Sequence, residues 1–272
     1  MDIPELEKMA RQIRRDIVEM THAAGSGHPG GSLSATDFVA ALYFSKLRHD
    51  PKDICWAGRD RVVFSKGHVA PVLYSALARS GYFPPEDLTD LRKLKSHLQG
   101  HPCTCTPGVE VGTGSLGQGL SVVVGMALAA KLDGLDTLFY CINGDGELQE
   151  GQIWEALMAA GHYKLDNVCT FVDYNNLQID GWVEDVMGVA PLADKLRSFR
   201  WHVIEIDGHD MGQILDALAQ FPRDDGKPTA IVGTTIKGKG VSFMENEAGW
   251  HGRAPNDEEY EQAMRELADP EE

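Results

Sequence analysis

The sequence has no long hydrophobic run, no excess of basic residues and few aromatic residues. The longest apolar stretches, residues 121–132 and 229–235, are interrupted or too short to cross a hydrocarbon layer of about 30 Å. The 25 Lys and Arg residues are outnumbered by 41 Asp and Glu residues, which gives a net charge of −16. We therefore expect neither a transmembrane protein nor a general binder of nucleic acid or of anionic membranes.

Cysteine is also scarce. The five cysteines, from Cys55 to Cys169, form an odd and scattered set that predicts no disulfide framework in a chain of this length. The N-terminus alternates acidic and basic residues and lacks the basic start and apolar core of a secretory signal. We therefore expect a reduced, cytoplasmic compartment. With 43% hydrophobic and 24% charged residues, the composition is globular and excludes disorder, collagen and coiled coil.

Apolar runs alternate with amphipathic segments along most of the chain. Apolar residues repeat at helical spacing over residues 4–24 and predict a first helix, which a glycine-rich loop at 25–31 follows. Ser34 and Asp37 predict the start of the next helix. The expected strands are residues 61–65, 137–142, 168–172, 201–206 and 229–235. The expected helices between the later strands are residues 121–132, 152–160, 192–199 and 211–221.

Strands that alternate with helices of this length indicate parallel βαβ units. We therefore predict an α/β fold with a mostly parallel central sheet and helices on both faces. Residues 1–272 would form a single domain. Only the acidic segment 256–272 shifts in composition, and we expect it to form a peripheral helix.

The strongest chemical signal follows the expected strand at 137–142. Gly144 and Gly146 permit a sharp turn and let backbone amides approach a ligand, and Asp145 lies between them. Asn175 follows the next strand, 30 residues after Asp145, so neighbouring parallel strands would bring the two side chains to one edge of the sheet. Their oxygens, with a backbone carbonyl, are ligands that suit Mg²⁺. The metal would in turn bind the oxygens of a diphosphate. Taken alone, Gly-Asp-Gly is equally consistent with a plain turn.

The spacing of Asp145 and Asn175 resembles the thiamine diphosphate motif, and further motifs resemble transketolase nearly from end to end. They are Ser26-Gly27-His28-Pro29-Gly30, Asp60-Arg61, Ser65-Lys66-Gly67-His68, Gly100-His101-Pro102, Thr113-Gly114-Ser115-Leu116-Gly117-Gln118-Gly119, Gly144-Asp145-Gly146-Glu147-Leu148-Gln149-Glu150-Gly151, Asp207-Gly208-His209-Asp210 and Trp250-His251-Gly252. The resemblance is to the amino-terminal, diphosphate-binding third of transketolase. It implies the thiamine diphosphate-binding fold and the first subunit of a split transketolase.

The resemblance implies a site for thiamine diphosphate and for Mg²⁺ or Ca²⁺. The metal ligands would be Asp145, Asn175 and the backbone oxygen of Leu177. The cofactor-binding residues would be His68, Gly114, Leu116, Gly144, Asp145, Gly146, Asn175, Ile179 and His251. The catalytic residues would be His28, His68, His101 and His251, which line the substrate channel, and Glu150, which would meet a glutamate of the partner subunit.

The residue type supports a chemical role for the four channel histidines. Imidazole titrates near neutrality and both donates and accepts hydrogen bonds, so it can move protons on sugar hydroxyls. Each histidine alone is as consistent with a structural role. These four, however, lie in loops flanked by glycine or proline, where residues that face a ligand are expected. The histidines that we interpret as structural are His22, His49, His97, His162 and His202.

Two further patterns are weaker. His97, His101, Cys103 and Cys105 lie close in sequence, but Cys-x-Cys lacks the usual spacing of zinc ligands and a second cysteine pair is missing, so zinc is disfavoured. The Lys-Gly-Lys-Gly segment at 237–240 lacks the pattern of a P-loop. It is either a solvated basic loop or, by resemblance, part of a flexible segment that covers the cofactor.

The resemblance implies transfer of a two-carbon ketol unit from a ketose phosphate to an aldose acceptor, with thiamine diphosphate as the electron sink. The partner would be a C-terminal subunit that carries the pyrimidine-binding domain, in an α₂β₂ assembly. Two alternatives stay open: the α subunit of a 2-oxo acid dehydrogenase and a nucleotide-binding regulatory module on a flavodoxin-like sheet. Ser115, where full-length enzymes commonly have proline, and the divergent segment 240–251 leave the acceptor sugar open.

Overall fold

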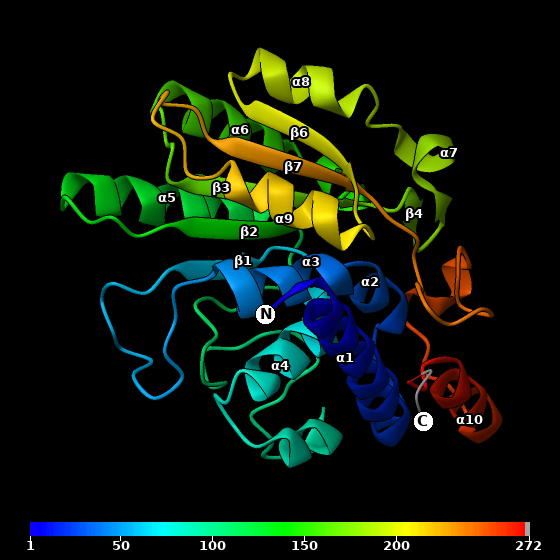
Figure 1. Ribbon diagram of the computed structural model, residues 1–272. Helices are drawn as coiled ribbons and strands as arrows, with labels where there is room; N and C mark the ends of the chain where they lie inside the picture. Colours follow the sequence, from blue (N-terminus) through cyan, green and yellow to red (C-terminus); the bar gives the residue numbers. More distant parts are fainter. Residues whose placement is uncertain (270–272) are drawn as a thin grey trace.

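A five-stranded sheet forms the centre of the molecule (Figure 1). The computed structural model describes residues 1–269. In the sheet the strands lie in the order β1-β2-β3-β7-β6, and every neighbouring pair is parallel. The strands are β1 (Arg61–Phe64), β2 (Phe139–Gly144), β3 (Val168–Tyr174), β6 (His202–Asp207) and β7 (Thr229–Thr234). The predicted α/β fold with a mostly parallel central sheet is confirmed.

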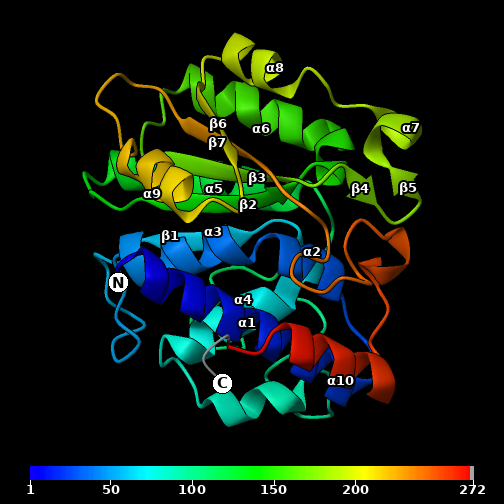
Figure 2. The same ribbon diagram turned by 45° about the vertical axis from the view of Figure 1, so that its right-hand side comes forward.

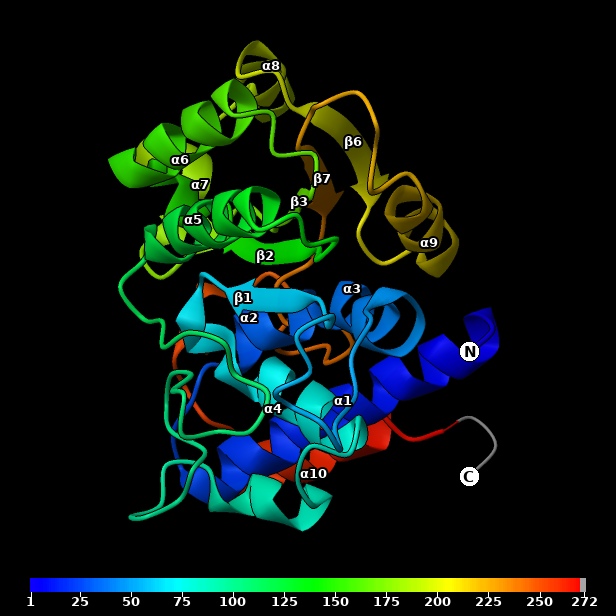
Figure 3. The same ribbon diagram turned by 90° about the vertical axis from the view of Figure 1, so that its left-hand side faces the viewer.

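Helices cover both faces of the sheet, because successive side chains of each strand point to opposite sides (Figure 3). Ile142 and Phe171 belong to one hydrophobic core, whereas Cys141 and Val172 belong to the other. The first core includes α1 (Ile3–Ala24), α3 (Thr36–Ala41), α4 (Ala70–Arg79) and α9 (Met211–Ala219). The second includes α5 (Gln118–Leu132), α6 (Gly151–His162) and α8 (Leu192–Ser198).

The first and last described helices pack side by side (Figure 2). Helix α1 begins at a capping box, in which the side chains of Asp2 and Glu5 each accept a hydrogen bond from the other's backbone N–H. Helix α10 (Asp257–Glu266) also begins at a capping box and lies against α1. The predicted first helix is confirmed. The predicted peripheral segment 256–272 contains α10, and its residues 270–272 lie outside the described residues.

The prediction of a loop over residues 25–31 is wrong in its second half. Helix α2 (Pro29–Ser34) begins inside that range, and Gly30 is buried in it. A Cβ atom on Gly30 would lie 2.9 Å from the carbonyl oxygen of Trp250. Glycine at position 30 therefore lets the helix approach this backbone closely, and in this second half glycine serves tight packing rather than a loop.

Ser34 and Asp37 do not cap a helix, contrary to the prediction. Helix α3 begins after Ala35 without a side-chain cap. The Ser34 hydroxyl instead donates a hydrogen bond to Asp173 at 2.5 Å, and Asp37 forms an ion pair with Arg14 at 2.6 Å. Buried polar side chains need hydrogen-bond partners. Here Ser34 and Asp37 bond to residues far away in the sequence rather than to the backbone N–H groups at the start of the helix.

Short elements complete the fold. They are α7 (Val183–Met187), the antiparallel pair β4 (Leu177–Gln178) and β5 (Gly181–Trp182), a π-helix at Leu42–Lys46, and 3₁₀ turns at Gly67–Val69, Pro85–Asp90, Gly146–Gln149 and Ala248–His251. No helix within residues 1–269 is both long enough and apolar enough to span a membrane. Cys103 and Cys105 form one local disulfide, which was not predicted from the sequence, and Cys55, Cys141 and Cys169 are free.

Candidate active site

A cavity of about 190 Å³ lies at the carboxyl edge of the sheet, where β2 and β3 end. Figures 1 and 2 show α2, β4 and the segment after β7 gathered at this edge. Ten of the predicted site residues line the cavity: His68, Leu116, Gly144, Asp145, Gly146, Glu150, Asn175, Leu177, Ile179 and His251. Gly144 pairs with Asp173 across the two strands, so the turn at Asp145 and the turn at Asn175 meet as the spacing predicts.

Asp145 and Asn175, one from each turn, both line the cavity and bring side-chain oxygen atoms to it. Asp145 accepts hydrogen bonds from the backbone N–H of Gly146, at 2.8 Å, and of Asn176. Asn175 Oδ1 accepts the backbone N–H of Leu177 at 3.1 Å. Burial, followed by the negative charge of Asp173, raises the pKa of Asp145 to about 6. A buried carboxylate beside amide and carbonyl oxygens is a donor set that suits a hard divalent cation.

Asp173 connects this region to the protein interior. It is fully buried and pairs with the ammonium group of Lys66, and it also accepts hydrogen bonds from Ser34, Thr235 and Asn175. Burial opposes ionisation of this carboxyl, but the charge and hydrogen bond of Lys66 hold its pKa below the usual value. The network fixes Asn175 and places a buried cation beside the cavity.

Lys237 supplies a second buried ammonium group. Its side chain is 2% exposed, and Nζ donates to the Leu177 carbonyl oxygen at 2.8 Å and to His251 Nδ1 at 2.9 Å. Burial lowers the pKa of Lys237 to about 8. Lys66 and Lys237 both line the cavity, although neither is among the predicted site residues. Two desolvated cations at one cavity fit an anionic ligand such as a diphosphate.

The four predicted channel histidines lie together, and two of them, His68 and His251, line the cavity. The ring centroid of His28 is 5.4 Å from that of His68, 6.0 Å from His101 and 5.6 Å from His251. The rings of His68 and His251 are 4.9 Å apart. They come from the start of α2, two 3₁₀ turns and the loop before Pro102, so the fold assembles a cluster from four separate segments.

The cluster is electrically neutral at neutral pH. Burial is the main cause of a lowered pKa at each of the four rings, and it is reinforced by cations: Arg92 at His28 and His101, Lys66 at His68 and Lys237 at His251. The pKa is about 4 for His28 and about 3 for His251. Neutral imidazoles can both accept and donate hydrogen bonds, as ligand hydroxyl groups require.

The remaining predicted residues lie around this cluster. Gly114 lies against His101, since a Cβ atom there would be 3.2 Å from the imidazole ring. Ile179 lines the cavity and is 63% exposed. Glu150 is exposed at the rim, at the start of α6. Glu147 is buried and accepts the backbone N–H of Gly117 at 2.9 Å, so it fixes the neighbouring loop.

The alternative zinc pattern has no matching geometry in the described part of the chain. Cys103 and Cys105 bond to each other, and His97 Nε2 lies 3.2 Å from Asp87 Oδ2. Within residues 1–269, no three His, Cys, Asp or Glu side chains are grouped as metal ligands. His101 belongs instead to the histidine cluster.

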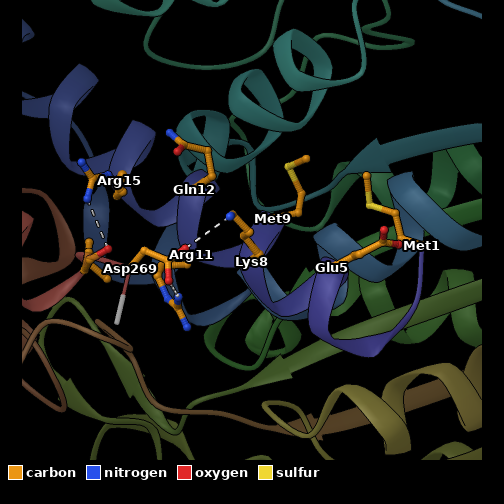
Figure 4. Close-up of a pocket in the computed structure, with 9 residues that line it drawn as sticks. Met1, Glu5, Lys8, Met9, Arg11, Gln12, Arg15 and Asp269 are labelled. Atoms are coloured by element: carbon orange, nitrogen blue, oxygen red, sulfur yellow. Dashed lines mark hydrogen bonds and ion pairs between the residues drawn. The ribbon is translucent and has the colours of Figure 1, made fainter. Parts of the chain in front are cut away.

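A second cavity, of about 490 Å³, lies far from the strand ends, between α1 and the segment around Asp269 (Figure 4). Lys8 and Arg11 line it, and each lies 3.4 Å from a carboxylate oxygen of Asp269. The described residues that line it include no histidine and no buried lysine. Over the described range, this second cavity thus lacks the histidines and the buried lysines that line the cavity at the carboxyl edge of the sheet.

The fold and the site together define an α/β protein with two buried lysines at a cavity on the carboxyl edge of a parallel sheet, beside a cluster of four neutral histidines. Residues 6–271 match the family described as transketolase, thiamine diphosphate binding domain. The chain belongs to the transketolase family, and the predicted thiamine diphosphate cofactor and transferase class are confirmed. The family match does not favour the alternative of a 2-oxo acid dehydrogenase subunit.

Similar proteins fall into two size classes. The 6-deoxy-6-sulfo-D-fructose transketolase subunit SqwG of Clostridium sp. is 47% identical, and the match covers 97% of this chain and 96% of that protein. An apulose-4-phosphate transketolase subunit of Phocaeicola vulgatus is 42% identical over 99% of this chain and 96% of that protein. The transketolase structure from Campylobacter jejuni superimposes with a TM-score of 0.93 at 38% identity, covering 98% of this chain and 43% of that chain. This chain thus has the extent of a transketolase subunit.

Proposed function

We propose that this chain is the diphosphate-binding subunit of a two-chain transketolase, which transfers a two-carbon ketol unit from a ketose to an aldose. The observation that carries the proposal is the cluster of four neutral histidines beside two buried lysines at one cavity. Bound thiamine diphosphate would supply the nucleophilic carbon and the electron sink for this transfer. The chain's own residues bind the cofactor, orient the sugar and handle protons.

The cofactor would lie along the cavity with its diphosphate at the buried cations. Lys66, Lys237, His68 and His251 would contact the diphosphate, and the backbone amide of Gly146, next to Gly144, would donate to it. Asp145, Asn175 and the backbone oxygen of Leu177 would hold Mg²⁺ or Ca²⁺. A carbonyl oxygen has two lone pairs, so Leu177 can accept from Lys237 and also bind a cation. Gly114 and Leu116 would contact the aminopyrimidine, and Ile179 the thiazolium ring.

The histidine cluster would bind the sugar. His28 and His101 would line the outer part of the channel, and His68 and His251, which line the cavity, would lie nearer the diphosphate and the buried lysines. Because all four rings are neutral, they can hold ketose hydroxyl groups and move a proton to or from the sugar oxygens. The cations around them favour sugars with an anionic group, which supports sugar phosphates as substrates.

The partner would be a subunit that carries the pyrimidine-binding domain. The two relatives described above are named as transketolase subunits and have nearly the same extent as this chain. We infer that residues 1–272 form one diphosphate-binding domain, that Glu150 faces a partner glutamate, and that the assembly is α₂β₂. A cytoplasmic location is part of the proposal, because phosphorylated sugars do not cross membranes unaided.

The proposal is tested by reconstitution. The chain is mixed with its partner subunit, thiamine diphosphate and Mg²⁺, and ketol transfer is measured on a panel of ketoses that includes phosphorylated and sulfonated sugars. We expect transfer by the mixture and none by the chain alone. Asp145→Ala should abolish it, and Asp180→Ala, which changes an exposed carboxylate near the cavity, should not. Transfer by the isolated chain, or oxidative decarboxylation of 2-oxo acids by the mixture, would overturn the proposal.

A further inference from the structure

His209 lies in the turn after β6 and bridges two distant parts of the chain. Its Nδ1 atom is 2.7 Å from Asp37 Oδ2, and its Nε2 atom is 2.8 Å from the backbone nitrogen of Ile236. The backbone N–H of Ile236 can only donate, so Nε2 is the acceptor. Nδ1 therefore carries the proton and donates it to Asp37. This arrangement fixes both the tautomer and the orientation of the ring.

Asp37 is itself held by Arg14. The guanidinium group of Arg14 donates two hydrogen bonds to the Asp37 carboxylate, at 2.9 and 2.6 Å, and its Nε atom donates a third to the backbone oxygen of Lys239 at 3.1 Å. Asp37 and Arg14 are both buried. Burial opposes the charge of Asp37, but Arg14 and then His209 bring its pKa down to about 2. The carboxylate is thus a permanent anchor for both neighbours.

His209 and Arg14 hold the backbone on either side of Lys237. His209 accepts from Ile236, and Arg14 donates to Lys239. Between these points the N–H of Gly238 donates to the carbonyl oxygen of Gly30 at 3.0 Å. The Lys237 side chain leaves this fixed stretch of backbone and reaches Leu177 and His251. A lysine side chain has four rotatable bonds, so the position of its ammonium group depends on how firmly its backbone is held.

We propose that Arg14, Asp37 and His209 form a clamp that positions Lys237 for the phosphate groups of the cofactor. The inference rests on the proposed function, since it takes Lys237 to contact the diphosphate. His209 is a positioning residue: it contacts the backbone of the segment that carries Lys237 and acts through that segment. The Asp207-Gly208-His209-Asp210 motif supplies neither a channel histidine nor a metal ligand. The clamp gives this motif a role.

The test compares His209→Ala and His209→Gln with Gln213→Ala as the matched control. Gln213 lies in the first turn of α9, four residues after His209, and accepts the backbone N–H of Asp207 at 3.0 Å. Among the hydrogen bonds of the described residues, none joins Gln213 to Ile236. Three quantities are measured: hydrogen exchange of the Ile236 amide in the full chain, the thiamine diphosphate concentration for half-maximal activity of the reconstituted complex, and kcat at saturating cofactor. Melting temperature is recorded for every variant.

We expect His209→Ala to speed hydrogen exchange at the Ile236 amide and to raise the half-saturating cofactor concentration about tenfold. A rise of this size corresponds to the loss of one hydrogen bond between Lys237 and the charged diphosphate. The kcat at saturating cofactor should change less than twofold, because the clamp does not contact the sugar. His209→Gln retains a hydrogen-bond acceptor for the Ile236 N–H and should keep part of the affinity for thiamine diphosphate. Gln213→Ala should behave like the parent chain.

Two results would overturn the clamp. One is an unchanged half-saturating cofactor concentration in His209→Ala, and the other is an equal rise in His209→Ala and Gln213→Ala, which would mean general loosening of the turn. If His209→Ala lowers the melting temperature strongly, His209→Gln is compared with the parent instead. The clamp then requires that His209→Gln bind thiamine diphosphate more weakly than the parent does. A parent complex that binds no thiamine diphosphate would overturn the proposed function instead.

Discussion

Charged and polar groups at the carboxyl edge of the sheet differ sharply from those on the outer helices. At the edge, Lys66 and Asp173 form an ion pair whose side chains are 3% and 0% exposed. On the outer surface, Lys8 pairs with Asp269, and the Lys8 side chain is 72% exposed. Surface pairs are screened by water and contribute little, whereas a buried charge without its partner is strongly unfavourable. The edge is therefore the region where single substitutions have the largest consequences.

The histidines show the same contrast. On the outside, His22 hydrogen-bonds to Asp257 at 2.9 Å, and His49 contacts the Tyr43 carbonyl oxygen at 3.0 Å. These rings have ordinary partners within the chain. Within residues 1–269, none of the channel histidines hydrogen-bonds to a carboxylate; His28 and His251 instead accept from Arg92 and Lys237. Rings without a carboxylate partner remain neutral and are available to a ligand.

The largest effect is expected from Lys66→Met. This change leaves the Asp173 carboxylate buried without its cation, and we expect the free energy of unfolding to fall by about 3–5 kcal/mol. Lys8→Met should change it by less than about 1 kcal/mol. Denaturant unfolding of the two variants measures the difference. Asp173→Asn added to Lys66→Met should recover part of the loss, and similar values for the two single variants would contradict the contrast between edge and surface.

A somewhat smaller effect is expected from the channel histidines. His28→Asn and His101→Asn should each lower ketol transfer by the reconstituted enzyme about 10²-fold, since each removes a group that holds or moves a proton of the sugar. The half-saturating concentration of thiamine diphosphate should change little. His162→Asn, at an exposed ring on α6, serves as the matched control and should retain full activity. Parent rates for both channel variants would show that the cluster has another role.

Much of the fold follows from local pattern, because buried parallel strands are continuous apolar runs. The strand predicted at 137–142 is β2 (Phe139–Gly144), displaced by two residues because pairing with β3 sets the start at Phe139. Helix α2 could not be predicted in this way. Its Pro-Gly-Gly sequence favours a loop locally, and the close contact with Trp250 that requires Gly30 is 220 residues away in the chain.

The part of the candidate site that could be predicted consists of polar residues that directly follow a predicted strand. Asp145 and Asn175 follow neighbouring parallel strands, so their spacing alone places them together. Lys66 and Lys237 could not be identified as buried, because lysine is ordinarily solvated. Lys66 is buried against Asp173, 107 residues away, and Lys237 against Leu177, 60 residues away. Such contacts depend on the tertiary fold, and no local pattern encodes them.

A third prediction concerns pH and His28. The pKa of His28 is about 4 in the folded chain against an ordinary value of 6.5, so below pH 6.5 the unfolded chain binds the proton more strongly. Stability should therefore fall as the pH decreases from about 6.5 to 4, and His28 should account for about 1–2 kcal/mol of the fall after allowance for its partial exposure to solvent. Unfolding at several pH values compares the parent with His28→Asn, whose curve should be flatter. Parallel curves would show that the ring is not desolvated.

The smallest effect is expected at an outer histidine. His22 on α1 stacks on Tyr260 of α10, with ring centroids 4.3 Å apart, and pairs with Asp257, whose side chain is 97% exposed. Because water screens this pair, His22→Asn should lower the free energy of unfolding by only about 0.5–1 kcal/mol and the melting temperature by about 1–3 °C. Ketol transfer by the reconstituted enzyme should equal that of the parent, since His22, Asp257 and Tyr260 do not line the cavity at the strand ends. A loss of activity without a larger loss of stability would mean that the outer helices communicate with the channel, and the separation of the two regions would then be wrong.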